Sequence, residues 1–187
     1  SLPLSPSLLE KLDRLGFVTP TPIQRDAIGP ALEGRDLVGI AQTGTGKTLA
    51  FALPIAARLP KGQIALVLAP TRELAIQIQE VFGQIGMRTA LLIGGAPMRP
   101  QISQLRNRPE VIVATPGRLM DHHAQRTLDL KDTAIVVLDE ADRMLDMGFA
   151  PTVRKILDKL PRERQTMLFS ATMPREITDL ASRYLVK

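Results

Sequence analysis

Short apolar runs alternate with longer amphipathic stretches along most of the chain. The apolar runs are rich in β-branched residues and are bounded by glycine, proline or charged residues, as expected of buried strands. We therefore predict strands at residues 37–40, 64–68, 90–93, 111–114, 135–138 and 166–169. The stretches between them place apolar side chains at helical spacing. These predict helices at residues 5–16, 24–32, 49–59, 72–86, 98–106, 116–124, 150–160 and 174–185.

Strands that are apolar throughout and separated by helices are typical of a mostly parallel sheet covered by helices on both faces. The length of 187 residues fits one such α/β domain, and no repeat or linker-like segment divides it. In open sheets of this kind the functional loops follow the carboxyl ends of the strands. Candidate functional residues are therefore expected directly after the predicted strands.

A glycine-rich loop follows the first predicted strand and leads into a helix. It consists of Ala41, Gln42, Thr43, Gly44, Thr45, Gly46, Lys47 and Thr48. Glycines let backbone N–H groups converge on a phosphate, and the helix start favours the same negative charge. Lys47 would reach the β- and γ-phosphates, and the Thr48 hydroxyl would bind Mg²⁺. Ala41 departs from the general pattern, which has glycine at this position.

A carboxylate cluster follows the predicted strand at 135–138. Its residues are Asp139, Glu140, Ala141 and Asp142. In a chain with a phosphate loop, Asp139 is placed to hold Mg²⁺, directly or through water. Glu140 would orient or deprotonate an attacking water. The alternative is a solvated acidic loop, which a fully apolar strand before it makes a poor explanation.

Three other strand ends carry groups suited to binding anions. They are Pro70, Thr71 and Arg72; Gly94 and Gly95; and Thr115, Pro116, Gly117 and Arg118. Threonine caps, exposed N–H groups and arginines favour phosphates, so the three loops together suggest a tracked phosphate backbone. The alternative for each loop is plain helix capping with an exposed arginine. Ser170 and Thr172 follow the last strand and by themselves indicate only a helix cap.

The composition adds modest constraints. A net charge of +5 and a sequence pI near 10 hint at a polyanionic partner. Aromatic residues make up only 3% of the chain, so stacking on bases is poorly supported and contacts should involve the nucleic-acid backbone. There is no cysteine, no signal-peptide pattern and no apolar run of membrane-spanning length. We expect a cytoplasmic protein without membrane contact, and we expect His122 and His123 to be surface residues.

Together these motifs resemble those of the DEAD-box family of ATP-dependent RNA helicases, over nearly the whole chain. Gly16 and Phe17, followed by residues 20–24, resemble the family's Q motif. The resemblance implies that Phe17, Thr19 and Gln24 bind ATP, with Gln24 reading adenine. Spacing alone would instead favour a solvated glutamine at a helix start. Ala41 is ordinary in the family's form of the phosphate loop.

The same resemblance implies roles for the other strand ends. The three anion-binding loops resemble family segments that grip the phosphates and sugars of single-stranded RNA or a short duplex. Ser170 and Thr172 resemble the motif that couples ATP state to unwinding through contacts with the acidic cluster, here Asp142. The implied fold is a RecA-like P-loop NTPase domain spanning residues 1–187, with ATP and Mg²⁺ as cofactors and Lys47, Asp139 and Glu140 as catalytic residues.

The chain resembles the first of two RecA-like domains, and nothing in it matches the motifs of the second. We expect it to be a monomeric part of a longer helicase whose C-terminal RecA-like domain supplies arginine fingers, and to bind nucleotide with little turnover by itself. Three rival functions remain. A DNA helicase or translocase is disfavoured by the Q motif and by the sequence of the acidic cluster. An ATP-gated clamp on RNA would have the same motifs. A metabolite kinase has no support in the sequence.

Overall fold

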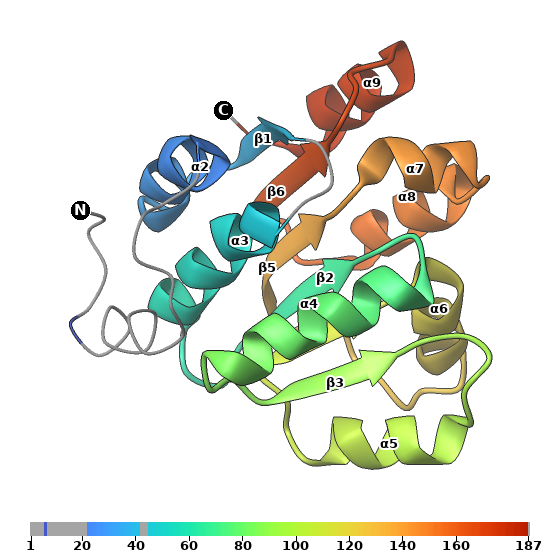
Figure 1. Ribbon diagram of the computed structural model, residues 1–187. Helices are drawn as coiled ribbons and strands as arrows, with labels where there is room; N and C mark the ends of the chain where they lie inside the picture. Colours follow the sequence, from blue (N-terminus) through green and yellow to red (C-terminus); the bar gives the residue numbers. More distant parts are fainter. Residues whose placement is uncertain (1–5, 7–21, 42–44, 187) are drawn as a thin grey trace.

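The computed structural model describes residue 6, residues 22–41 and residues 45–186. The helix predicted over residues 5–16 lies outside these ranges except for residue 6. Figure 1 shows the arrangement of the described elements, a central sheet with helices on both faces. No helix in the described ranges is both long enough and apolar enough to cross a membrane.

All the paired strands of the sheet run parallel, in the order β1-β6-β5-β2-β4-β3. The strands are β1 (Leu37–Ile40), β2 (Ile64–Leu68), β3 (Thr89–Leu92), β4 (Val111–Ala114), β5 (Thr133–Leu138) and β6 (Gln165–Ser170). Each predicted strand is present, with ends that differ from the prediction by at most two residues. The expected parallel α/β fold is confirmed.

In the described ranges, helices lie before β1, between consecutive strands and after β6. They are α2 (Pro22–Leu32), α3 (Thr45–Arg58), α4 (Arg72–Gln84), α5 (Met98–Arg106), α6 (Pro116–Ala124), α7 (Ala141–Asp146), α8 (Ala150–Lys159) and α9 (Arg175–Tyr184). The short helix α7 was not predicted. It has only six residues, and just Ala141 and Met144 of these are buried, which is too little apolar signal for a periodic pattern.

Two hydrophobic cores lie on opposite faces of the sheet. The first contains the buried side chains of α2, α3 and α4, and the second those of α6, α7, α8 and α9. Consecutive residues of β2 enter different cores: Ala65 and Val67 face the first, and Leu66 and Leu68 face the second. This alternation explains why the strands are apolar throughout, since each side chain of a central strand is covered on one face or the other.

Backbone hydrogen bonds continue for one step beyond the carboxyl ends of several strands. These bonds join Ala41 to Ser170, Ala69 to Ala114, Thr115 to Leu92 and Asp139 to Leu68, at 2.9–3.0 Å. The predicted functional loops after β1, β2, β4 and β5 are therefore anchored to the sheet at their first residue. This positions the candidate site along a single edge of the sheet.

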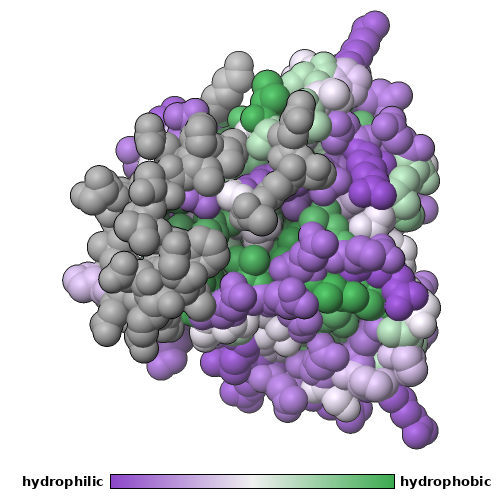
Figure 2. Space-filling view, viewed as in Figure 1, coloured by the Kyte–Doolittle hydropathy of each residue, from purple (hydrophilic) through white to green (hydrophobic). Residues whose placement is uncertain are grey.

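The face shown in Figure 2 is largely hydrophilic where the described residues are visible, and its apolar areas are small. A few large apolar side chains are exposed, among them Ile40 on the edge strand β1 and Met173 after β6. Isolated exposures of this kind are ordinary for a folded domain.

Candidate nucleotide and nucleic-acid site

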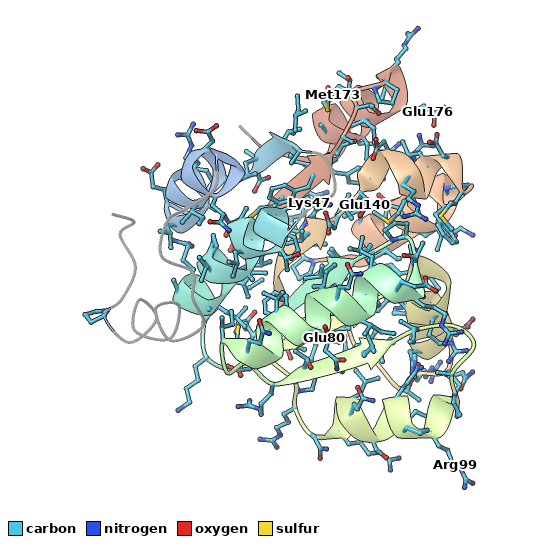
Figure 3. All side chains as sticks on the ribbon, in the orientation of Figure 1. Lys47, Glu80, Arg99, Glu140, Met173 and Glu176 are labelled. Atoms are coloured by element: carbon cyan, nitrogen blue, oxygen red, sulfur yellow. The ribbon has the colours of Figure 1, made fainter. Side chains whose placement is uncertain are left out.

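Lys47 lies between the two carboxylates of the acidic cluster. It comes from the first turn of α3, whereas Asp139 and Glu140 directly follow β5. Its Nζ atom is 3.0 Å from Oδ1 of Asp139 and 3.5 Å from Oε2 of Glu140. In Figure 3 the labelled Lys47 and Glu140 lie close together beyond the end of β5. The structure thus brings together the three residues that the sequence predicted to be catalytic.

Asp139 is fully buried, and its surroundings change its acidity. Burial raises the pKa of Asp139 to about 6, although the positive charge of Lys47 opposes the shift. Its Oδ1 atom accepts a hydrogen bond from the backbone N–H of Glu140 at 3.0 Å. Its Oδ2 atom is also buried, and no hydrogen-bond partner for it lies within the described ranges. An unsatisfied buried carboxylate oxygen is costly, so it indicates a place where a ligand completes the site.

The residues around this oxygen fit Mg²⁺. Mg²⁺ prefers oxygen ligands and is commonly held by one or two protein groups together with water and substrate phosphates. Asp139 supplies a free carboxylate oxygen, and Thr48, which is 8% exposed, lies at the start of α3 next to Lys47. The described residues contain no cluster of three or more side chains able to hold a metal by themselves. This donor set therefore suits a metal bound jointly with phosphates.

Glu140 is held by charges on both sides. Its Oε1 atom lies 3.5 Å from Nη1 of Arg143 in α7, and Oε2 faces Lys47. Its backbone adopts a left-handed conformation, with φ of 49° and ψ of 52°, which is uncommon for a residue other than glycine. Such strained positions cluster at functional sites. Arg143 was not singled out from the sequence, because one arginine in a short helix carries no signal there.

Gln24 reaches the phosphate loop from α2. Its Nε2 atom donates to the carbonyl oxygen of Gly46 at 3.0 Å, and the residue is only 6% exposed. The solvated glutamine that spacing alone favoured is therefore wrong. Helix α3 begins at Thr45, so the last four residues of the predicted loop, 45–48, form its first turn. The predicted ATP-binding residues Phe17, Thr19, Gln42, Thr43 and Gly44 lie outside the described ranges.

The loop after β6 is bonded to the acidic cluster. The backbone N–H and the hydroxyl of Thr172 both donate to Oδ2 of Asp142, at 3.1 and 2.9 Å. The Ser170 hydroxyl donates to the carbonyl of Thr172 at 2.6 Å. Burial works to raise the pKa of Asp142, but the hydrogen bonds from Thr172 and its other neighbours outweigh it and leave the pKa lowered. The three residues predicted to couple the motifs are thus in contact.

Two of the predicted anion-binding loops meet at Arg72. Thr71 caps α4, and its hydroxyl oxygen accepts a hydrogen bond from the backbone N–H of Leu74 at 3.2 Å. The exposed side chain of Arg72 passes over Gly95, where a Cβ atom would lie 2.6 Å from Nη1 of Arg72. The flexible end of Arg72 could move aside for a Cβ atom, but Gly95 also has φ of +78°, a conformation that favours glycine. Gly94 precedes it in the same loop, whereas Pro70 is buried.

The third loop departs from the prediction in two ways. Thr115 occupies the N-cap position of α6, but its side chain makes no capping hydrogen bond. Its side chain is buried, and Pro116 is buried as well, so that in this part of the loop Gly117 is the exposed residue. Arg118 is not the exposed arginine that was expected. Its side chain is 14% exposed and donates to the carbonyl oxygen of Ala96 at 2.7 Å.

The prediction that His122 is a surface residue is wrong, because its side chain is fully buried. Its Nε2 atom lies 2.8 Å from Oε1 of Gln101, and its Nδ1 atom lies 2.8 Å from the hydroxyl of Thr127. Burial and the nearby charge of Arg118 lower its pKa. Two adjacent histidines in a helix face different sides, which periodicity could have indicated; His123 is only half-buried.

A parallel α/β sheet with a lysine in the first turn of the helix after β1 and an acidic strand end at the same edge defines a P-loop nucleotide-binding domain. The sequence pattern of the DEAD/DEAH box helicase family matches residues 21–180. The chain belongs to this family.

Individual relatives agree with this assignment. The chain is 50% identical over 191 residues to DEAD-box ATP-dependent RNA helicase 30 of Arabidopsis thaliana, covering 96% of this chain and 32% of that protein. It is 52% identical over 182 residues to the ATP-dependent rRNA helicase rrp-3 of Neurospora crassa, covering 93% of this chain and 35% of that protein. The crystal structure of a DEAD box protein from Methanococcus jannaschii superimposes with a TM-score of 0.94 at 41% identity, covering 99% of this chain and 53% of that one.

The chain therefore spans about a third of the length of these curated relatives and about half of the solved structure.

Proposed function

We propose that this chain is the ATP-binding half of an ATP-dependent RNA helicase. The observation that carries the proposal is the contact of Lys47 with Asp139 and Glu140, beside a buried oxygen of Asp139 that no described residue satisfies. The family and the names of the relatives, which are RNA helicases, agree with it.

In this proposal ATP binds at the phosphate loop together with Mg²⁺. Lys47 exchanges its contact with the carboxylates for the β- and γ-phosphates, and Gln24 holds the loop from α2 while reading adenine. Asp139 and Thr48 hold the metal, which neutralises charge on the phosphates. When Lys47 turns to the phosphates, a metal held by Asp139 would compensate the buried negative charge that Lys47 leaves.

Glu140 is proposed to act on the attacking water. Once Lys47 turns to the phosphates, the carboxylate keeps its pairing with Arg143, which holds Oε1 in place. Oε2 is then available to accept a hydrogen bond from water and to orient or deprotonate it. The contact between Asp142 and Thr172 is proposed to transmit the state of this site to the loop after β6.

The proposed RNA surface comprises the loops after β2, β3 and β4. Arg72 offers a charge to a phosphate, Gly95 and Gly117 offer backbone N–H groups at exposed positions, and Gly94 offers one at a half-buried position. Contacts to 2′-hydroxyl groups would favour RNA over DNA. The second RecA-like domain of the same polypeptide would complete both the RNA groove and the ATP site.

The test uses the full-length protein that contains this chain. ATP turnover should be stimulated by RNA and much less by DNA of the same sequence. Glu140→Gln should keep ATP affinity but reduce stimulated turnover by at least about a hundredfold, the usual contribution of a positioned general base. Equal stimulation by DNA would favour a DNA translocase, and unchanged turnover in Glu140→Gln would remove Glu140 from the mechanism.

A further inference from the structure

Arg118 and two buried polar residues form a network behind the proposed RNA surface. We propose that Arg118, Gln101 and His122 are positioning residues that hold the glycine loop after β3 in its RNA-binding shape, and that Arg118 does not itself contact phosphate. This inference rests on the proposed function, because it assigns a task to residues behind the proposed RNA surface.

The network holds both ends of the loop after β3 by hydrogen bonds. At one end, Nε2 of Gln101 donates to the carbonyl oxygen of Ile93, the residue that follows β3, at 2.9 Å. At the other, Nη1 of Arg118 donates to the carbonyl of Ala96 at 2.7 Å. Gly94 and Gly95 lie between these two anchored carbonyls. A loop with two adjacent glycines has high conformational freedom, so fixing both of its ends removes most of it.

The three side chains also hold one another. The amide of Gln101 donates to Ile93, so its Oε1 atom faces the other way and accepts from Nε2–H of His122 at 2.8 Å. Nη1 of Arg118 reaches the same Oε1 atom at 3.3 Å. Gln101 is 3% exposed and His122 is fully buried. Neither can touch RNA, so any effect they have on RNA binding must act through the loop.

The side chain of Arg118 is held inside the protein by several contacts. Besides Ala96 and Gln101, its guanidinium lies 3.6 Å from a carboxylate oxygen of Asp121, with Nε as the near atom, and the side chain is 14% exposed. Pulling it out to a phosphate would break its hydrogen bond to the carbonyl of Ala96 and remove one of the two donors to Oε1 of Gln101. Arg72, in contrast, is exposed and lies over Gly95. The cation for the phosphate is therefore Arg72, and Arg118 shapes the loop beneath it.

Salt dependence distinguishes the two roles. A cation that neutralises a phosphate of single-stranded RNA contributes about 0.7 to the slope of log affinity against log salt concentration. Backbone N–H groups carry no net charge and displace no counterions. Loss of loop shape should therefore weaken RNA binding by the same factor at every salt concentration, while loss of a phosphate contact should also flatten the slope.

The experiment compares Arg118→Lys, Arg118→Ala, Gln101→Met and Arg72→Ala in this chain, binding a short single-stranded RNA at several salt concentrations. Lysine keeps the charge but cannot bridge Ala96 and Gln101, so we expect all three network variants to lose about tenfold in affinity with the parent slope. Arg72→Ala should lower the slope by about 0.7. Arg106→Lys, exposed at the far end of α5, is the matched control and should behave as the parent.

Hydrogen exchange provides a readout that does not depend on RNA. The amides of Gly94, Gly95 and Ala96 should exchange faster in the network variants than in the parent, while those of the central strands stay protected. Full affinity in Arg118→Lys together with a flatter slope in Arg118→Ala would show a direct phosphate contact and overturn the positioning role. Parent-like affinity in Gln101→Met would overturn it as well. If the parent chain binds no RNA at any salt concentration, the positioning role fails, whereas the proposed function is decided by RNA stimulation of the full-length protein.

Discussion

At the scale of single residues, Asp139 determines much of the chemistry of the site. It is fully buried, paired with Lys47 on one oxygen and without a described partner on the other. A carboxylate in this position is held ready for a cation, at a cost to the stability of the fold. That cost should be measurable through its dependence on pH.

Asp139→Asn should change the pH dependence of stability in a defined direction. The native pKa of about 6 lies above the ordinary value of 3.8, so the folded protein binds this proton more tightly than the unfolded chain. As pH rises from 3.8 to about 6, the unfolded chain releases the proton first, and the contribution of Asp139 to stability falls. Asparagine has no proton to release. The unfolding free energy of the variant minus that of the parent should therefore rise, by up to about 3 kcal/mol, and level off above pH 6.

Urea unfolding of both proteins between pH 4 and pH 7.5 measures this difference. Asp26→Asn, on the exposed side of α2, is the control for the loss of a carboxylate elsewhere in the chain. A difference between Asp139→Asn and the parent that stays flat across the interval would contradict the raised pKa.

At the scale of elements, the contact between α7 and the loop after β6 is the clearest link between two motifs. Thr172→Val removes one of the two hydrogen bonds to Asp142 and keeps the shape of the side chain. Unfolding free energy should fall by about 1 kcal/mol, as is usual for one hydrogen bond. In the full-length protein, RNA strand separation should fall much more than ATP turnover.

Thr178→Val is the matched control for this prediction. Thr178 lies on the exposed side of α9, and its hydroxyl donates to the carbonyl of Pro174, the N-cap residue of the same helix. Equal losses of turnover and strand separation in Thr172→Val would argue that the contact supports the ATP site alone and couples nothing.

The sequence predicted the elements well for a physical reason. Strands buried on both faces are apolar at every position, as in β4, and this pattern stands out against the amphipathic helices around them. Helix α7 was not predicted because it is short and begins in the acidic cluster.

The site was predicted less completely than the fold. Lys47, Asp139 and Glu140 each follow a recognisable strand end, so their convergence could be expected. The inward turn of Arg118 and the contact between Gln101 and His122 could not, because they depend on how α5 and α6 pack together. A polar residue in a helix has the same appearance in a sequence whether it faces water or a buried carbonyl.

At the scale of the whole molecule, the chain covers only part of the length of its relatives. If a second domain supplies an arginine finger, its absence should cost on the order of 10³–10⁵ in ATP turnover. We expect this chain to bind ATP but to hydrolyse it at a small fraction of the rate of the full-length protein, with RNA present in both assays. Turnover by the chain alone at about 1 s⁻¹ or faster, the ordinary range for phosphoryl-transfer enzymes, would contradict this.

The central claim is that Lys47 and Asp139 form an ATP–Mg²⁺ site, and its most direct test is the affinity of this chain for ATP with and without Mg²⁺. In Lys47→Ala the affinity for ATP–Mg²⁺ should fall by about tenfold or more, since a charge-assisted contact to phosphate is lost. Lys61→Ala removes an exposed lysine before β2 and should bind as the parent does. Circular dichroism is the control that each variant is folded. Equal ATP–Mg²⁺ affinity in folded Lys47→Ala and in the parent would contradict the account.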